Sequence, residues 1–97
     1  MIEKRHFYID GTWVGPHQPR DHAVIDPSTE EPCAVISLGD RADTEAAVAA
    51  ALRAGPDWAA TPPAARLAAV ERLLAIYQSR AEEMAQAMSL EMGAPID

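Results

Sequence analysis

Residues 6–14 carry the strongest fold signal of the chain, and they read His6-Phe7-Tyr8-Ile9-Asp10-Gly11-Thr12-Trp13-Val14. A type I′ turn needs a positive φ at both central residues, and Asp-Gly adopts this conformation at low cost. The aromatic and β-branched residues on either side suit two short strands. The stretch therefore predicts a β-hairpin with Asp10 and Gly11 at its tip.

A second, looser hairpin is predicted after the polar loop at residues 15–21. Two β-rich runs, residues 23–25 and 33–38, are separated by Asp26-Pro27-Ser28-Thr29-Glu30-Glu31-Pro32. Asp bonds its own downstream backbone in turns, and Pro presets φ there. Residues 1–38 are therefore expected to form two β-hairpins.

From Gly39 onward the apolar period changes from two to about 3.6 residues, which predicts helices. Asp40 is a suitable N-cap residue for the first helix. The negative charge of Asp43 interacts favourably with the positive, N-terminal end of the helix dipole. Val48, Ala51 and Leu52 fall on one apolar stripe of this helix. Gly55-Pro56 is predicted to end it.

The second helix is expected to open with Thr61 as N-cap and Pro62 at its first position. Its predicted buried face consists of Leu67, Val70, Leu73, Leu74 and Tyr77. A capping box, Ser79-Arg80-Ala81-Glu82, should separate it from the third helix, which Gly93 ends. Residues 40–93 are thus expected to hold three helices.

The order of these elements predicts an incomplete fold of the α/β class, or α+β for the isolated fragment. Two short hairpins and three helices leave sheet edges and helix faces uncovered. Much of the 48% hydrophobic content is alanine. Burial of these small side chains offsets only part of the conformational entropy that the chain loses on folding. The apolar faces are therefore expected to contact partners outside the segment.

Charge and composition exclude several classes of partner. The formal net charge is −7, with no run of Lys or Arg, whereas affinity for nucleic acid depends on clustered basic residues. No apolar stretch approaches the roughly 20 residues that span a bilayer, and no secretory leader opens the sequence. We expect a cytoplasmic protein without a nucleic-acid or membrane partner.

The chain offers no residue set for catalysis or cofactor binding. Cys33 lies within a predicted strand, where free Cys is usually a small buried side chain. None of His6, His17 and His22 has a second ligand at metal-binding spacing. The five glycines form no phosphate-binding motif. We predict no catalytic and no cofactor-binding residue here.

Taken together, these elements resemble the N-terminal segment of the NAD(P)-dependent aldehyde dehydrogenase superfamily. The matching pieces occur in family order and are Phe7–Val14, Val24–Glu31, Asp43–Ala51, Trp58, Thr61–Arg66 and Leu90–Pro95. Ala94 departs from the Lys that the family often has. The resemblance implies that residues 1–97 are the outer, N-terminal part of the cofactor-binding domain, covered by a dinucleotide-binding sheet of the same polypeptide.

The resemblance implies an oxidoreductase that converts an aldehyde to a carboxylic acid with NAD or NADP. A cysteine thiolate attacks the aldehyde in such enzymes, and a glutamate activates the water that hydrolyses the thioester. Those residues and the cofactor loops are expected downstream of Asp97. The fragment alone should be inactive, and the full-length enzyme a homo-oligomer, a dimer or tetramer.

One site is carried over from the family residue by residue. Several members bind a monovalent cation, K⁺ or Na⁺, at positions matched here by Val24, Ile25 and Glu91. Backbone carbonyls and a carboxylate are hard oxygen ligands. Glu91 also stands in the last helical turn, where its charge opposes the helix dipole. The alternative is that Glu91 only accepts bonds from nearby backbone donors.

Two other interpretations remain open. The chain is also compatible with a stand-alone helical protein-interaction module without enzymatic activity, whose second and third helices bind a partner. A decayed or split gene is the third. The coding sequence after Asp97 distinguishes them, because an open frame with a dinucleotide-binding unit and a catalytic Cys favours the enzyme.

Overall fold

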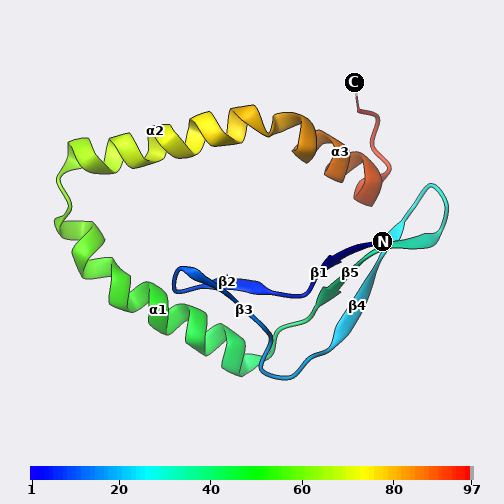
Figure 1. The fold of residues 1–97 in the computed structure, drawn as a ribbon, viewed down its shortest axis with the longest axis horizontal. Helices are drawn as coiled ribbons and strands as arrows, with labels where there is room; N and C mark the ends of the chain where they lie inside the picture. The colour runs from blue at the N-terminus through cyan, green and yellow to red at the C-terminus, as the bar shows by residue number, and fades with distance from the viewer. Residues whose placement is uncertain (97) are drawn as a thin grey trace.

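The computed structural model describes residues 1–96, which form a mixed α/β structure with the strands before the helices (Figure 1). Its elements are β1 Ile2–Lys4, β2 Phe7–Ile9, β3 Thr12–Val14, β4 Asp21–Asp26, β5 Glu31–Ser37, α1 Arg41–Ala60, α2 Pro63–Ser79 and α3 Ala81–Met92. The predicted fold class is confirmed. The predicted range 1–97 extends to Asp97, which lies outside the described residues.

The N-terminal hairpin is confirmed with the predicted turn. Strands β2 and β3 pair antiparallel, with Ile9 opposite Thr12. Asp10 and Gly11 have φ angles of 54° and 76°, as a type I′ turn requires. Tyr8 and Trp13 face each other across the strands, with ring centroids 5.2 Å apart.

The second hairpin is also confirmed, and it belongs to a three-stranded sheet in the order β1-β5-β4. Strand β4 pairs antiparallel with β5, with a register irregularity between Val24 and Ile25. Strand β1, which the sequence pattern did not predict, pairs parallel with β5, placing Ile2 opposite Ala34. Three residues carry too short a pattern to reveal a strand whose partner lies about 30 residues away.

The prediction that Gly55-Pro56 ends the first helix is wrong, because α1 continues through both residues to Ala60. Proline disfavours helix in the preceding residue because its Cδ clashes with the backbone N–H and the Cβ of that residue, and Gly55 has no Cβ. The remaining cost at Pro56 is one lost backbone bond and a ring clash with the preceding turn. The helix ends instead at Thr61, whose hydroxyl donates to the carbonyl of Asp57 at 2.8 Å.

Both predicted caps around the second helix are wrong in detail. Thr61 is the C-cap of α1, Pro62 is the N-cap of α2, and Pro63 takes the first helical position. The capping box at residues 79–82 does not form, because the Ser79 hydroxyl donates backward to the Ile76 carbonyl at 2.7 Å. The end of α3 is confirmed, with Gly93 in the left-handed conformation.

The predicted apolar faces of the helices are not buried within residues 1–96. The five residues expected to form the inner face of α2 are 52–65% exposed, and Val48 and Leu52 of α1 are exposed as well. Buried residues are few and small: Ala34 and Ser37 of β5, and Ala50 of α1. Each apolar helix face therefore lacks a second layer to pack against.

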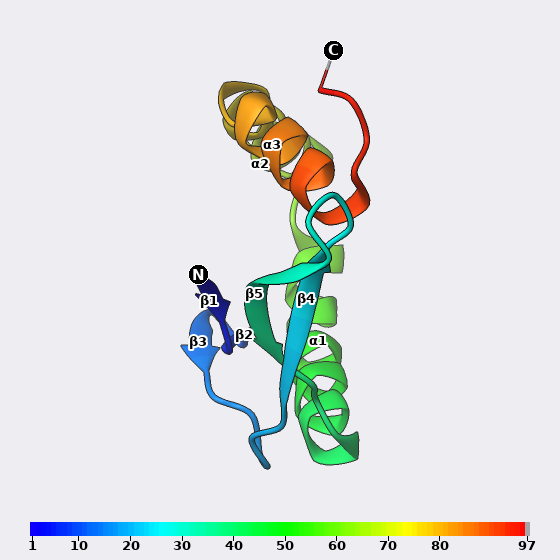
Figure 2. The same cartoon turned by 90° about the vertical axis from the view of Figure 1, so that its right-hand side faces the viewer.

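The described chain is a thin, open layer. Helices α1, α2 and α3 form an arch beside the strands (Figure 1), and the view turned by 90° shows the layer from its edge (Figure 2). The extents are 49 × 37 × 15 Å, with a radius of gyration of 17.2 Å. A compact chain of this length has a radius of gyration of about 12.5 Å. The exposed apolar residues of the helices are left without a covering layer.

Candidate functional site

The end of α3 lies against the turn between β4 and β5, and both views show this (Figures 1 and 2). A Cβ placed on Gly93 would lie 3.1 Å from Cγ of Pro27. Glu91 is two residues before Gly93, and Val24 and Ile25 are two to three residues before Pro27. The fold thus brings together the two elements that carry the three predicted cation ligands.

The backbone at Val24 and Ile25 departs from regular strand pairing. Val24 is paired with Ala34 and Ile25 with Pro32, so a residue of β5, Cys33, is skipped between them. Such irregularities interrupt the ladder of backbone hydrogen bonds. The Val24 carbonyl accepts a bond from the Cys33 thiol at 3.4 Å. Glu91 is exposed and forms no hydrogen bond or ion pair within residues 1–96.

Cys33 has the surroundings of a packed thiol. Its side chain is half-buried in β5, and its hydrogen-bond partner is a backbone carbonyl. Activation of a thiol requires a nearby cation, a His or a helix N-terminus. The hydrogen bond of Cys33 within residues 1–96, to the Val24 carbonyl, involves none of these groups.

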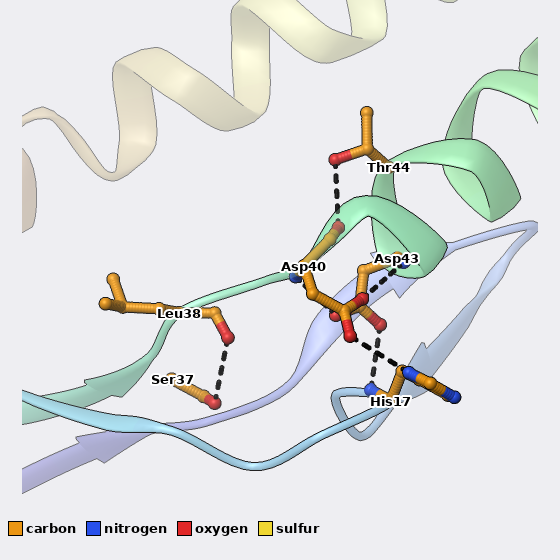
Figure 3. Close-up of polar contacts among 6 residues, drawn as sticks. All are labelled: His17, Ser37, Leu38, Asp40, Asp43 and Thr44. Carbon is orange, nitrogen blue, oxygen red and sulfur yellow. Dashed lines mark hydrogen bonds and ion pairs between the residues drawn. The ribbon is translucent and has the colours of Figure 1, made fainter.

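A polar cluster at the start of α1 was only half predicted. Asp40 caps the helix, and Asp40 and Asp43 form a reciprocal capping box. His17, from the loop between β3 and β4, joins them through its ring Nδ1, 2.9 Å from Asp40 Oδ2 (Figure 3). The local Asp-x-x-Asp pattern signalled the cap. No local pattern signals a partner 23 residues earlier.

The contact shifts the pKa values of both His17 and Asp40. The hydrogen bond to the Asp40 carboxylate, with its negative charge, raises the pKa of His17 above the ordinary 6.5. The same bond, followed by the Asp43 backbone N–H, lowers the pKa of Asp40 below the ordinary 3.8. The cluster therefore favours a protonated imidazole beside an ionised carboxylate.

The β5–α1 connection does not suit a cofactor phosphate. Dinucleotide phosphates bind at the N-terminus of a helix that follows a strand, through free backbone N–H groups. Here that helix end carries Asp40 and Asp43, and Asp40 accepts the Asp43 N–H at 3.0 Å. The two carboxylates would repel a pyrophosphate, so these residues do not fit a nicotinamide cofactor.

An apolar groove of about 530 Å³ runs between β1 and the helices α2 and α3. Its apolar lining consists of Ile2, Leu73, Ile76, Tyr77, Met84 and Ala87. Lys4, Arg80 and Glu83 border it.

Among residues 1–96, no group of three His, Cys, Asp or Glu side chains could hold a metal ion. None of the helices in the same range is long and apolar enough to cross a bilayer.

Comparison with protein families finds that the model described as "Aldehyde dehydrogenase family" matches residues 13–97. The chain is 42% identical over 96 residues to a 3-succinoylsemialdehyde-pyridine dehydrogenase of a Pseudomonas species, covering 99% of this chain and 20% of that protein. It is 35% identical over 86 residues to a hydroxyisobutyraldehyde dehydrogenase of Mycolicibacterium austroafricanum, covering 89% and 17%. The chain thus spans about a fifth of the length of these relatives.

Two solved structures are also similar to this chain. The crystal structure of an aldehyde dehydrogenase from Bartonella henselae superposes with a TM-score of 0.97 at 54% identity, covering 100% of this chain and 20% of that one. A mutant of aldehyde dehydrogenase C from Pseudomonas syringae, complexed with NAD⁺ and octanal, gives a TM-score of 0.92 at 46% identity. That match covers 95% of this chain and 19% of the other.

Proposed function

The chain belongs to the aldehyde dehydrogenase family, and from this premise we propose that it is part of an enzyme that oxidises an aldehyde to a carboxylic acid with NAD⁺ or NADP⁺. The observation that carries the proposal is the match to the Bartonella henselae enzyme over the whole chain, with a TM-score of 0.97. The complex of the Pseudomonas syringae relative with NAD⁺ and octanal supports the cofactor and substrate classes.

The residues described here take a structural place in this proposal. We assign residues 1–97 to the N-terminal, outer part of a cofactor-binding domain, with residues 1–38 as the strand region and 40–93 as the helices. The nucleophile, the general base and the cofactor loops are assigned to other parts of the polypeptide, because residues 1–97 span only about a fifth of the length of the relatives. At the β5–α1 junction, the Asp40 and Asp43 carboxylates also oppose phosphate binding.

The exposed surface supports a covering layer from the same polypeptide. The chain exposes 7656 Å², whereas a compact monomer of 10.4 kDa exposes about 5400 Å². The excess is of the size that obligate interfaces bury. Arg66 Nε is buried without a hydrogen-bond partner within residues 1–96, and buried donors are nearly always paired. An acceptor from the covering layer would satisfy it.

The alternative of a stand-alone interaction module has less support. It also predicts exposed apolar helix faces, but it gives no reason for a match along the whole chain to enzymes of about five times its length. The two proposals differ in what covers α2. In the enzyme the cover is permanent, and in the module the face is free until a partner binds.

The test of the activity is spectrophotometric. The full-length polypeptide carrying residues 1–97 should produce NADH or NADPH from aliphatic or semialdehyde substrates, with one molecule of acid formed per reduced cofactor. We propose further that the full-length enzyme is cytoplasmic and forms a homo-oligomer, a dimer or tetramer. Size-exclusion chromatography with light scattering tests the oligomeric state. Absence of turnover with either cofactor across a panel of aldehydes, in a folded protein, would contradict the enzyme proposal.

We also propose a monovalent-cation site for K⁺ or Na⁺ at Val24, Ile25 and Glu91. Two features support it: the register irregularity between Val24 and Ile25, and the contact between α3 and β4. A cation would also offset the unfavourable charge of Glu91 at the negative end of α3.

Thermal unfolding tests this site. The full-length protein should have a higher Tm in K⁺ or Na⁺ than in N-methylglucamine at equal ionic strength, and Glu91→Gln should remove the difference. Glu71→Gln, which removes an acid of the same type from α2, is the matched control and should keep it. An equal Tm in all three cations would contradict the proposal.

A further inference from the structure

The loop between β3 and β4 is fastened to the start of α1 by two bonds from one residue (Figure 3). The backbone N–H of His17 donates to Asp43 Oδ1 at 2.9 Å. The ring Nδ1 of His17 lies 2.9 Å from Asp40 Oδ2. Cap and loop are therefore one network, although 23 residues separate His17 from Asp40 in the sequence.

The network uses every carboxylate oxygen of the cap once. Asp40 Oδ1 accepts the Asp43 N–H, and Asp43 Oδ2 accepts the Asp40 N–H, each at 3.0 Å. The remaining oxygen of each carboxylate binds His17. His17 thus completes the capping box as a third member, through its ring and its backbone N–H.

We propose that His17 is a protonation-dependent latch, which holds the β3–β4 loop on the N-terminus of α1 when the imidazole is charged and loosens it when the imidazole is neutral. A charged donor beside a carboxylate makes a stronger bond than a neutral one. The backbone bond to Asp43 does not titrate with the ring. The loop is therefore loosened by deprotonation and not released.

The charges around His17 favour the protonated ring. Asp40 and Asp43 face it from α1, and both act to raise its pKa. Asp10 of the hairpin turn and Arg53 of α1 line the same cavity as His17, and they pair with each other at 3.5 Å. Arg20, from the same loop as His17, lines a neighbouring cavity with Asp40.

The direction of the pH effect follows from these shifts. Because the pKa of His17 is raised above 6.5 in the folded protein, its contribution to stability is complete below pH 6.5 and is lost as the pH rises through the folded value. Because the pKa of Asp40 is lowered, the pair is broken from the acid side only below pH 3.8. The latch is closed between these limits.

Hydrogen exchange on the full-length polypeptide tests the latch. Exchange is measured at pH 6.0 and pH 8.5 and normalised to the intrinsic rates, for peptides covering residues 15–21 and 40–47. The protection factor of the loop peptide should fall about two- to fivefold at the higher pH, which corresponds to the free energy that an exposed ion pair contributes. Peptides from α2 report whether each variant is folded.

Three variants decide the assignment. His17→Gln keeps a neutral donor, and Asp40→Asn keeps the cap acceptor but removes the charge, so both should abolish the pH dependence. His22→Gln, in β4, is the matched control and should behave as the wild type. A wild-type loop with equal protection at both pH values, or a pH dependence that survives His17→Gln, would overturn the proposal.

Discussion

Gly93 and Pro27 meet where the last helix passes the turn between β4 and β5. Gly93 has a φ of 72°, and a Cβ at this position would lie 3.1 Å from Cγ of Pro27. Gly93 is favoured for two reasons: the left-handed conformation ends α3, and the missing side chain allows the end of α3 to approach Pro27 in the β4–β5 turn.

Gly93→Ala should therefore destabilise the full-length protein by about 1–2 kcal/mol from the left-handed conformation alone, and by more if Pro27 cannot shift. Urea unfolding measures the loss. Gly93→Asn separates the two causes, because Asn tolerates the left-handed region but still carries a Cβ. Gly15→Ala is the control, since that position has no positive φ and a Cβ added there would have no neighbouring atom within 4 Å. Equal stability of Gly93→Ala and Gly15→Ala would contradict the prediction.

A substitution at Leu73 tests whether the rest of the polypeptide covers α2. It is 65% exposed within residues 1–96 and lines the apolar groove. If the rest of the polypeptide covers this face, Leu73→Ala should cost about 2–4 kcal/mol in the full-length protein. An exposed position would lose less than about 0.5 kcal/mol. Gln78→Ala, on the same helix, is the control, and a loss at Leu73 no larger than at Gln78 would favour the free face of an interaction module.

Cys33 should be dispensable for turnover. Its thiol donates to the Val24 carbonyl, and no hydrogen bond or ion pair within residues 1–96 joins it to a cationic or imidazole side chain. In steady-state assays of the full-length enzyme, Cys33→Ala should keep kcat and kcat/KM within about twofold of wild type, since inert, packed thiols do not act as nucleophiles. Substitution of the nucleophile elsewhere in the polypeptide should abolish turnover. A Cys33→Ala enzyme that folds but is inactive would reverse the assignment.

The ion pair between Arg80 and Glu83, at the junction of α2 and α3, can be tested through the stability of the protein at low pH. Arg80 Nε lies 2.7 Å from Glu83 Oε2, and this bond lowers the pKa of Glu83 below its ordinary 4.5. The pair should stabilise the protein above pH 4.5 and lose its contribution as the pH falls through the folded pKa. Glu83→Gln should lower the Tm slightly at pH 7, by an amount that shrinks below pH 4.5. Glu82→Gln is the control, and a difference that does not change with pH would refute the role of the pair.

Local chemistry explains why some of the predicted turns and helix ends are correct. The hairpin at Asp10-Gly11, the cap at Asp40 and the stop at Gly93 each depend on the φ preference or side-chain reach of residues within four positions of one another. The same kind of reasoning misplaced the end of α1, because the absence of a Cβ at Gly55 removes one part of the clash that normally makes the residue before Pro leave the helix.

The sequence by itself determined the order of the elements that follow β1, the hairpin turns and the family resemblance, since these depend on short patterns read along the chain. Only the tertiary structure decided that β1 pairs with β5, that His17 joins the cap of α1, and that Gly93 packs on Pro27. These contacts join residues 23 to 66 positions apart, and such contacts form only against the entropy cost of closing the loops between them. Their existence follows from how whole elements pack, which no local pattern encodes.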